Sequence, residues 1–117
     1  MPLEMVGIKG AGDLHSERVV LRATEDVNIG SYILFFSNEL REGLIASDVV
    51  SPIWLVDKEI SEGDYVVVYT RSGIEGSKKR SDGNRTYFFY RGLAKPQCSR
   101  EGVVAVLLEA RNWSVSR

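Results

Sequence analysis

The 117-residue chain is 44% hydrophobic, which is enough to build a core and excludes a disordered chain. Its length suits one domain over residues 1–117. The formal net charge of -1 excludes a general basic field that would attract nucleic acid or an anionic membrane, so any such attraction has to be local.

Along the chain, short apolar runs alternate with turn residues. The runs are rich in valine, isoleucine, tyrosine and phenylalanine, which suit the half-buried surface of a strand. Glycine, asparagine, aspartate and serine fill the intervals and favour turns. In order, the runs cover residues 3–8, 17–23, 31–36, 52–57, 64–70, 85–92 and 103–110. About seven short strands with regular turn signals predict an all-β sandwich or barrel.

Two segments have some helical character. In residues 37–50, Ser37 or Asn38 could cap a helix, but Gly43 and two β-branched valines limit the segment to one helical turn or a long loop. Alanine and leucine also favour helix in residues 103–110, but the valine-rich start and the preceding glycine favour a buried strand. The prediction is therefore all-β.

Two of the runs are apolar on both faces. In "DYVVVYT" (64–70), two tyrosines and a valine alternate with two further valines, and "TYFFYRG" (86–92) has the same character. Such a strand either is central in the sheet with both faces buried, or has one exposed apolar face that can bind a partner. An edge strand can also pair with another chain. We therefore expect a protein partner or a homo-oligomer.

Residues that support catalysis are sparse. His15 is the only histidine and Cys98 the only cysteine, which excludes a multi-histidine metal site and an intramolecular disulfide. Cys98 would need a lowered pKa and an orienting base such as His15 to act as a nucleophile. No glycine pattern matches a phosphate loop or a dinucleotide fingerprint, and Glu62 and Asp64 flank a turn glycine. We expect no enzyme, metal, cofactor or small-molecule substrate.

Neither a targeting signal nor a membrane-spanning segment is predicted from the sequence. The stretch "MPLEMVGIKGAGD" lacks the basic segment and apolar run of a signal peptide. No apolar run approaches the roughly 20 residues that a membrane helix needs. These features favour a cytoplasmic protein without a membrane partner.

The stretch "SKKRSDGNRTYFFYRGL" (77–93) combines basic and aromatic residues. Its "SDGN" segment suits a tight hairpin whose charged tip is simply solvated. Alternatively, the tip contacts phosphate and an aromatic ring, Tyr87 or Phe89, offers a stacking surface. The candidate anion or nucleic-acid patch consists of Arg71, Lys78, Lys79, Arg80, Arg85, Tyr87 and Arg91.

Three stretches carry a family resemblance. "ERVVLRATEDVNIGSYILFF" has a strand led by Glu17, then Gly30 and an aromatic-aliphatic strand. "PIWLVDKEISEGDYVVVYTRSG" has a Gly63–Asp64 turn before a valine-rich strand, and "VAVLLEARNW" forms a closing strand. With these features, nearly the whole chain resembles the lamin tail domain. It departs from that family at Ser31, where a Gly-Trp pair is common, and in the long loops 37–52 and 71–86.

The resemblance implies an immunoglobulin-like antiparallel β-sandwich that is not catalytic. Lamin tail domains bind proteins and, in some settings, DNA, but no binding residue carries over to this chain. The resulting prediction is a non-enzymatic module that binds a protein partner or itself through a sheet face or edge. The alternative is a nucleic-acid-binding accessory domain that uses the basic hairpin 77–91.

The two tryptophans allow a further alternative. We expect Trp54 and Trp113 to be buried anchors of the core. They could instead be ligand platforms. A carbohydrate-binding module is also possible on this fold, since Trp54 or tyrosine residues could stack on sugar rings, although no feature of the sequence selects that function.

Overall fold

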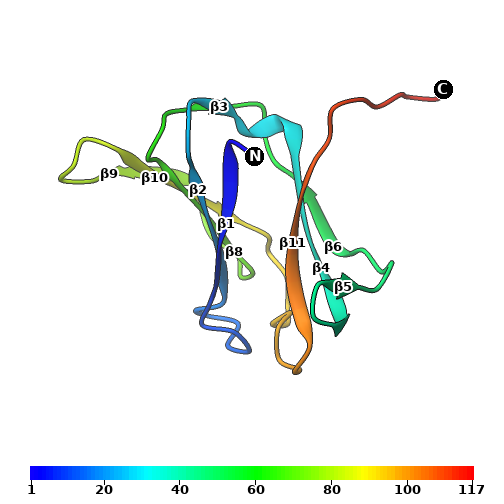
Figure 1. Ribbon diagram of the computed structural model, residues 1–117. Helices are drawn as coiled ribbons and strands as arrows, with labels where there is room; N and C mark the ends of the chain where they lie inside the picture. The colour runs from blue at the N-terminus through cyan, green and yellow to red at the C-terminus, as the bar shows by residue number, and fades with distance from the viewer.

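The computed structural model describes residues 1–117 and is built from strands, with one short 3-10 turn at Ile29–Ser31 and no α-helix (Figure 1). The strands are β1 (Leu3–Lys9), β2 (Arg18–Ala23), β3 (Val27–Asn28), β4 (Tyr32–Arg41), β5 (Leu44–Ile45), β6 (Val50–Trp54), β7 (Glu59–Ile60), β8 (Tyr65–Tyr69), β9 (Gly76–Lys79), β10 (Arg85–Tyr90) and β11 (Val103–Glu109). The all-β prediction is confirmed, and no helix has the length and hydropathy of a membrane span.

Each of the seven predicted runs lies on a strand, and four short strands were not predicted. Three of these, β3, β5 and β7, have only two residues, too few to show any periodicity. The fourth, β9, has the sequence "GSKK" and is exposed throughout. It is a strand only because it pairs with β10, so its own sequence carries no strand signal.

A β-hairpin forms at the start of residues 37–50, where the sequence suggested one helical turn or a long loop. Strand β4 continues to Arg41, and the chain reverses at Gly43, which has the positive φ of 78° that glycine tolerates best. Ser37, considered as a helix cap, is buried in β4, and its hydroxyl donates to the Ala46 carbonyl at 3.1 Å. Pairing with β5 therefore decides the structure of this segment.

Two principal sheets lie opposite each other (Figure 1). The first has the strand order β1-β2-β8-β10-β9. In the second, β4 pairs with β11 on one side and with β5 and β6 on the other, while β3 and β7 form a separate two-stranded ribbon. The expectation of purely antiparallel sheets is wrong at one pair, because β10 inserts between β8 and β9 and runs parallel to β8.

One hydrophobic core lies between the two sheets. Its buried side chains come from both principal sheets and from the segments that connect them. They are Leu3, Val19, Leu21, Ala23, Ile29, Tyr32, Leu34, Phe36, Leu55, Ile60, Val66, Val68 and Phe89. Alternate residues of β4, β8 and β10 are absent from this set, so these strands direct further apolar side chains away from the core.

Candidate functional site

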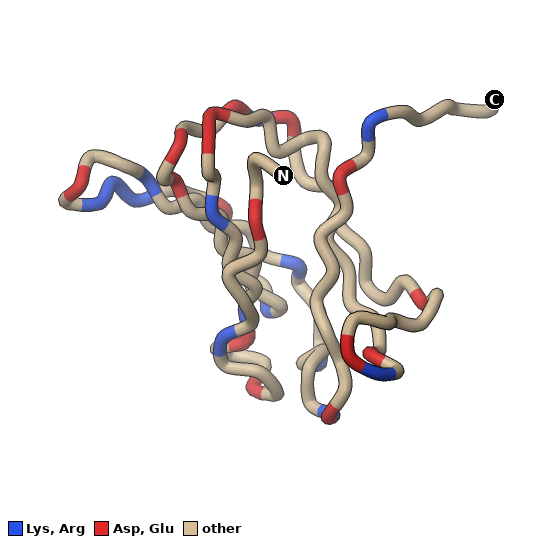
Figure 2. Tube along the Cα trace, viewed as in Figure 1, with Lys and Arg blue, Asp and Glu red and all other residues tan.

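Five of the seven residues of the predicted patch lie on the β9–β10 hairpin, which projects beyond the facing sheets (Figure 2). Lys79 lies opposite Arg85 and Lys78 opposite Thr86 in the hairpin register. Since side chains alternate along a strand, Lys78 and Lys79 point to opposite faces. Lys79 and Arg85 share the face of Tyr87, and both are exposed. The structure therefore brings together only part of the predicted patch.

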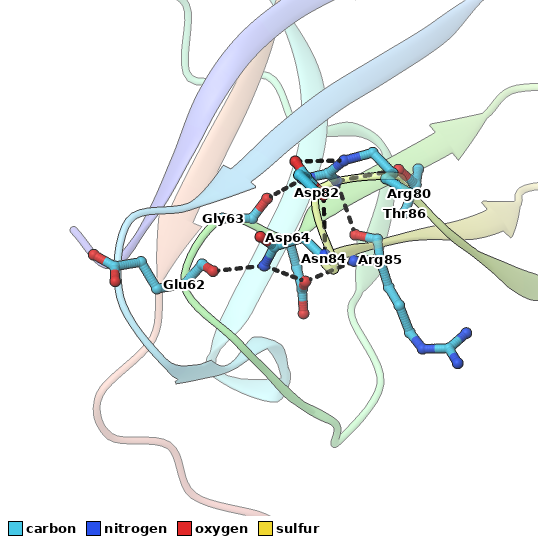
Figure 3. A network of polar contacts seen from close by, with 8 residues as sticks. All are labelled: Glu62, Gly63, Asp64, Arg80, Asp82, Asn84, Arg85 and Thr86. Atoms are coloured by element: carbon cyan, nitrogen blue, oxygen red, sulfur yellow. Dashed lines mark hydrogen bonds and ion pairs between the residues drawn. The ribbon is translucent and has the colours of Figure 1, made fainter.

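Arg80 is engaged by the chain itself (Figure 3). Its guanidinium donates to the Gly63 carbonyl at 2.7 Å and to the Arg85 carbonyl at 3.1 Å, and it forms an ion pair with Asp82 at 3.0 Å. Its Cζ also lies 4.7 Å from the centroid of the Tyr65 ring. These contacts hold the hairpin against the turn before β8, so Arg80 is part of the structure and is not a free cation.

Asp64, the next residue of the same turn, also anchors the hairpin (Figure 3). Its carboxylate accepts hydrogen bonds from the Arg85 N–H at 2.9 Å, the Asn84 Nδ2 at 3.0 Å and the Ser61 N–H at 2.8 Å. Burial by itself raises the pKa of Asp64, but these hydrogen bonds and the Arg80 charge outweigh it and lower the pKa below its ordinary value. The carboxylate is therefore stabilised in its ionised form.

Arg71 and Arg91 lie apart from the hairpin tip. The Arg71 Nε donates to the His15 carbonyl at 2.9 Å, and its guanidinium covers the rings of Tyr69 and Tyr90. Arg91 instead reaches the second sheet, where it donates to the carbonyls of Ser51 and Pro52. Burial lowers the pKa of Arg91. Both guanidinium groups therefore bridge segments of the chain.

Lys58, which was not predicted from the sequence, lies beside Tyr87 on the face that carries Lys79 and Arg85. The Lys58 Nζ lies 4.9 Å from the centroid of the Tyr87 ring, and the two residues line an open hollow of about 360 Å³ beneath the hairpin. Glu75 and Asp57 lie in the same lining, so the hollow is of mixed charge. Lys58 is distant from the hairpin in sequence, so no local signal could have grouped it with Tyr87.

The outer face of the first sheet carries a layer of tyrosine and arginine, here called the tyrosine–arginine face. Its apolar centre comes from the neighbouring strands β2, β8 and β10. Three tyrosine rings and three arginines surround this centre. The face consists of Val20, Val67, Phe88, Tyr65, Tyr69, Tyr90, Arg18, Arg71 and Arg80. Tyr69 and Tyr90 are stacked with centroids 5.2 Å apart. Val67 is only 8% exposed, so this face is largely covered by its own side chains.

The outer face of the second sheet is here called the apolar outer face. It consists of Ile33, Phe35, Trp54, Val104, Val106 and Leu108. Its central Phe35 is as buried as Val67, at 8% exposure, but the margins of the face are open to solvent. Cross-strand register places Leu108 and Trp54 on either side of Ile33. Leu108 is 49% exposed, and no ionisable side chain lies among these six. Strand β11 also pairs with β4 alone, which leaves its other edge without a strand partner.

The prediction that the two tryptophans are buried is wrong. Trp54 is 47% and Trp113 61% exposed, and their rings meet edge to face with centroids 5.1 Å apart. Trp54 lies on the outward-facing side of β6, because Ile53 takes the position facing the core. Trp113 lies in residues 110–117, which form no strand. Hydrophobicity alone cannot tell the two sides of a strand apart.

Glu17 is a buried carboxylate that ties three loops together. It accepts hydrogen bonds from the Gly12 N–H at 3.1 Å, the Thr70 hydroxyl at 2.5 Å, the Gln97 N–H at 2.7 Å and the Cys98 N–H at 2.8 Å. Burial raises its pKa, but the hydrogen bonds outweigh that effect and the pKa is lowered. All its contacts are internal, so its role is structural.

The possible Cys98–His15 pair shows no geometry for catalysis. Burial raises the pKa of the Cys98 thiol to about 12, and the charge of Glu17 contributes in the same direction. The thiol is therefore protonated at neutral pH, whereas a nucleophile would need the thiolate. The His15 N–H donates to Asp13 and the His15 carbonyl accepts from Arg71, and no hydrogen bond joins His15 to Cys98. No three His, Cys, Asp or Glu side chains are arranged to hold a metal ion.

Comparisons of the chain with protein-family models, curated proteins and solved structures found no match. The candidate site is therefore defined by the geometry described above.

Proposed function

We propose that this protein is a non-enzymatic interaction module, and that its first partner is a second copy of the chain, bound through the apolar outer face. The observation that carries the proposal is a face of six apolar side chains without an ionisable group. Two copies facing each other across a twofold axis would meet no like charges there. The unpaired edge of β11 adds backbone groups that a second strand can use.

The proposal extends to the fold type, an immunoglobulin-like β-sandwich of the lamin tail kind. It is supported by two sheets that face each other across a shared core and by the positions of the residues that carry the resemblance. Glu17 and Tyr32 are fully buried, and the Gly63–Asp64 turn holds the hairpin through the Asp64 carboxylate. These residues stabilise the interior of the domain. This is expected for a fold family whose characteristic residues are structural and do not form an active site.

Sedimentation velocity over a concentration series tests the self-association. Leu108→Lys places a charge in the proposed interface and should weaken dimerisation at least about tenfold, because a buried unpaired charge is costly. Val6→Lys is the matched control, since Val6 is 46% exposed but lies in the first sheet. A wild-type chain that remains monomeric up to about 1 mM would remove the second copy as partner.

A second candidate function is binding of single-stranded nucleic acid on the hairpin. Lys79 and Arg85 lie directly opposite each other, and like charges in that position are destabilising unless an anion lies between them. Tyr87 on the same face packs partly against the core with Lys58 over its ring, so Lys58 adds a cation and only the exposed part of the ring can stack on a base. The proposed contact set is therefore smaller than the patch in the sequence, and it is limited to one face of the hairpin.

Fluorescence anisotropy with labelled single-stranded DNA and RNA tests this candidate at several salt concentrations. Lys79→Glu should weaken binding and reduce its salt dependence, because one phosphate contact is lost. Lys78→Glu has the same chemistry on the opposite face and should have the smaller effect. Equal effects of the two variants would indicate diffuse attraction to the hairpin and not a defined site.

A further inference from the structure

A second hollow, of about 430 Å³, lies beside the two tryptophans. Its volume falls within the range of small-molecule sites in proteins. The hollow is formed where the 3-10 turn, the end of β6 and the segment around Trp113 meet. Its lining consists of Asn28, Gly30, Ser31, Trp54, Leu55, Asp57 and Trp113.

The aromatic part of this lining is held in place. The Trp54 Nε1 donates to the Gly30 carbonyl at 2.6 Å, which fixes the ring while about half of the residue is exposed. The Trp113 ring meets it at an interplanar angle of 89°. In this edge-to-face arrangement one ring covers part of the other, and the exposed remainder is a flat apolar surface. Large aromatic groups that stay exposed and fixed are suited to stacking on a ligand.

The polar part of the lining offers unused hydrogen-bonding groups. Asn28 is engaged at both ends of its amide, since its Oδ1 accepts from the N–H groups of Gly30 at 2.8 Å and Lys58 at 3.1 Å while its Nδ2 donates to the Asp57 Oδ1. The other Asp57 oxygen and the Ser31 hydroxyl have no partner within the chain. A Cβ at Gly30 would lie 2.9 Å from the Asp57 Cα, so these groups lie on a closely packed wall.

We propose that this hollow binds a neutral saccharide. A pyranose ring has an apolar face of C–H bonds that can stack on an indole, and hydroxyl groups at its rim that can donate to Asp57 and exchange hydrogen bonds with Ser31. The only ionisable residue in the lining is Asp57, so a phosphate or an acidic sugar would meet a like charge and no cation. The site goes beyond the proposed function, because it requires no second copy of the chain.

A quaternary ammonium ligand is the main competitor, because aromatic rings and a carboxylate also recognise cations. Such ligands are held by several ring faces that point to one centre. Here the edge-to-face contact occupies part of one indole, and the carboxylate is shared with Asn28. A flat stacking surface with hydroxyl-binding groups at its side therefore favours the sugar.

The two tryptophans are the only ones in the chain, and both line this hollow. Because Trp54 also belongs to the apolar outer face, the fluorescence titrations are made at one fixed protein concentration at which the chain is monomeric. The probes are cellohexaose, chitohexaose, xylohexaose, mannohexaose and maltohexaose, each titrated to about 10 mM, with tetramethylammonium chloride as the cationic probe. We expect a saturable change in emission with at least one of the hexasaccharides and none with the ammonium salt.

Isothermal titration calorimetry with the responding sugar then tests the residues. Trp113→Ala should weaken binding about tenfold and Trp113→Phe should largely restore it, while the thermal unfolding temperature stays unchanged because residue 113 lies outside the strands. Tyr69→Ala, on the opposite sheet, is the control for a general effect of losing an aromatic residue. The proposal is overturned if no hexasaccharide changes the emission, if only the ammonium salt does, or if Trp113→Ala and Tyr69→Ala weaken binding equally.

Discussion

The outer faces of the two sheets are built from strands with the same sequence pattern, but they differ in how well their apolar side chains are covered. Strands β8 and β10 in the first sheet, and β4 and β11 in the second, carry apolar residues on both sides. On the first sheet, Arg71 and Arg80 lie over the tyrosine rings and remove much of the apolar surface from water. On the second sheet no cation lies over the apolar side chains, and Leu108 and Trp54 are about half exposed.

This difference shows that a strand apolar on both sides does not by itself mark a binding surface. A long cationic side chain from a neighbouring loop can cover it, because the methylene groups pack on the rings and the charged end stays hydrated. Arg71 comes from the loop after β8, and Gly73 in the same loop packs against Tyr90, where a Cβ would lie 2.4 Å from the ring. On the apolar outer face the segment around Ala46 reaches Ser37 and Trp113 meets Trp54, but Leu108 stays 49% exposed. The apolar outer face is therefore the stronger candidate for association.

The largest expected effect separates the two sides of β11. Leu107 packs against the core, whereas its neighbour Leu108 points outward. Leu107→Lys should lower the free energy of unfolding by about 3 kcal/mol or more, because the lysine either buries its charge in the core or forces the core to open. Leu108→Lys should change it by less than about 0.5 kcal/mol in the monomer. Urea unfolding of both variants would measure this, and similar losses would mean that β11 has no free face.

A smaller effect is expected at the anchor of the hairpin. Asp64→Asn should cost about 2 kcal/mol at pH 7, because the amide group would face a backbone N–H donor without a hydrogen-bond partner. The folded pKa of Asp64 lies below the ordinary value of 3.8, so its carboxylate stabilises the fold above that pH. The contribution is lost as the pH falls through the folded pKa.

The urea stabilities of wild type and Asp64→Asn should therefore converge in acid. Asp48→Asn, in an exposed loop, serves as the control and should match wild type at every pH. A difference between wild type and Asp64→Asn that stays constant from pH 7 to pH 2 would show that the Asp64 carboxylate is not the titrating group.

The smallest expected effect tests the cover of the first sheet. Arg71→Ala removes the guanidinium over Tyr69 and Tyr90 and should reduce stability by only about 1 kcal/mol. It should also increase the fluorescence of a dye that binds exposed apolar surface, because the stacked rings are uncovered. Lys78→Ala, an exposed cation without a ring contact, should leave the dye signal unchanged. No increase with Arg71→Ala would mean that the loop around Gly73 is sufficient to cover the face.

Individual residues show how far the candidate site could be anticipated. The exposure of Lys79 and Arg85 and their closeness to Tyr87 follow from a hairpin with alternating side chains. The engagement of Arg80 does not, because its partner Gly63 belongs to a turn 17 residues away. Lys58 reached Tyr87 through tertiary packing alone. Contacts between segments distant in sequence leave no mark on the local pattern that sequence reasoning uses.

The sequence by itself determined that the protein is built of strands and where the seven longer ones lie, because the β-favouring residues of the short apolar runs and the turn residues between them act over a few neighbours. Tertiary structure decided the remainder. It paired β10 parallel to β8, created the short strands that exist only with a partner, covered one outer face with arginine and left both tryptophans exposed on the other. The physical reason is that both sides of a sheet can carry the same apolar residues, and only the packing of distant segments determines which side is covered.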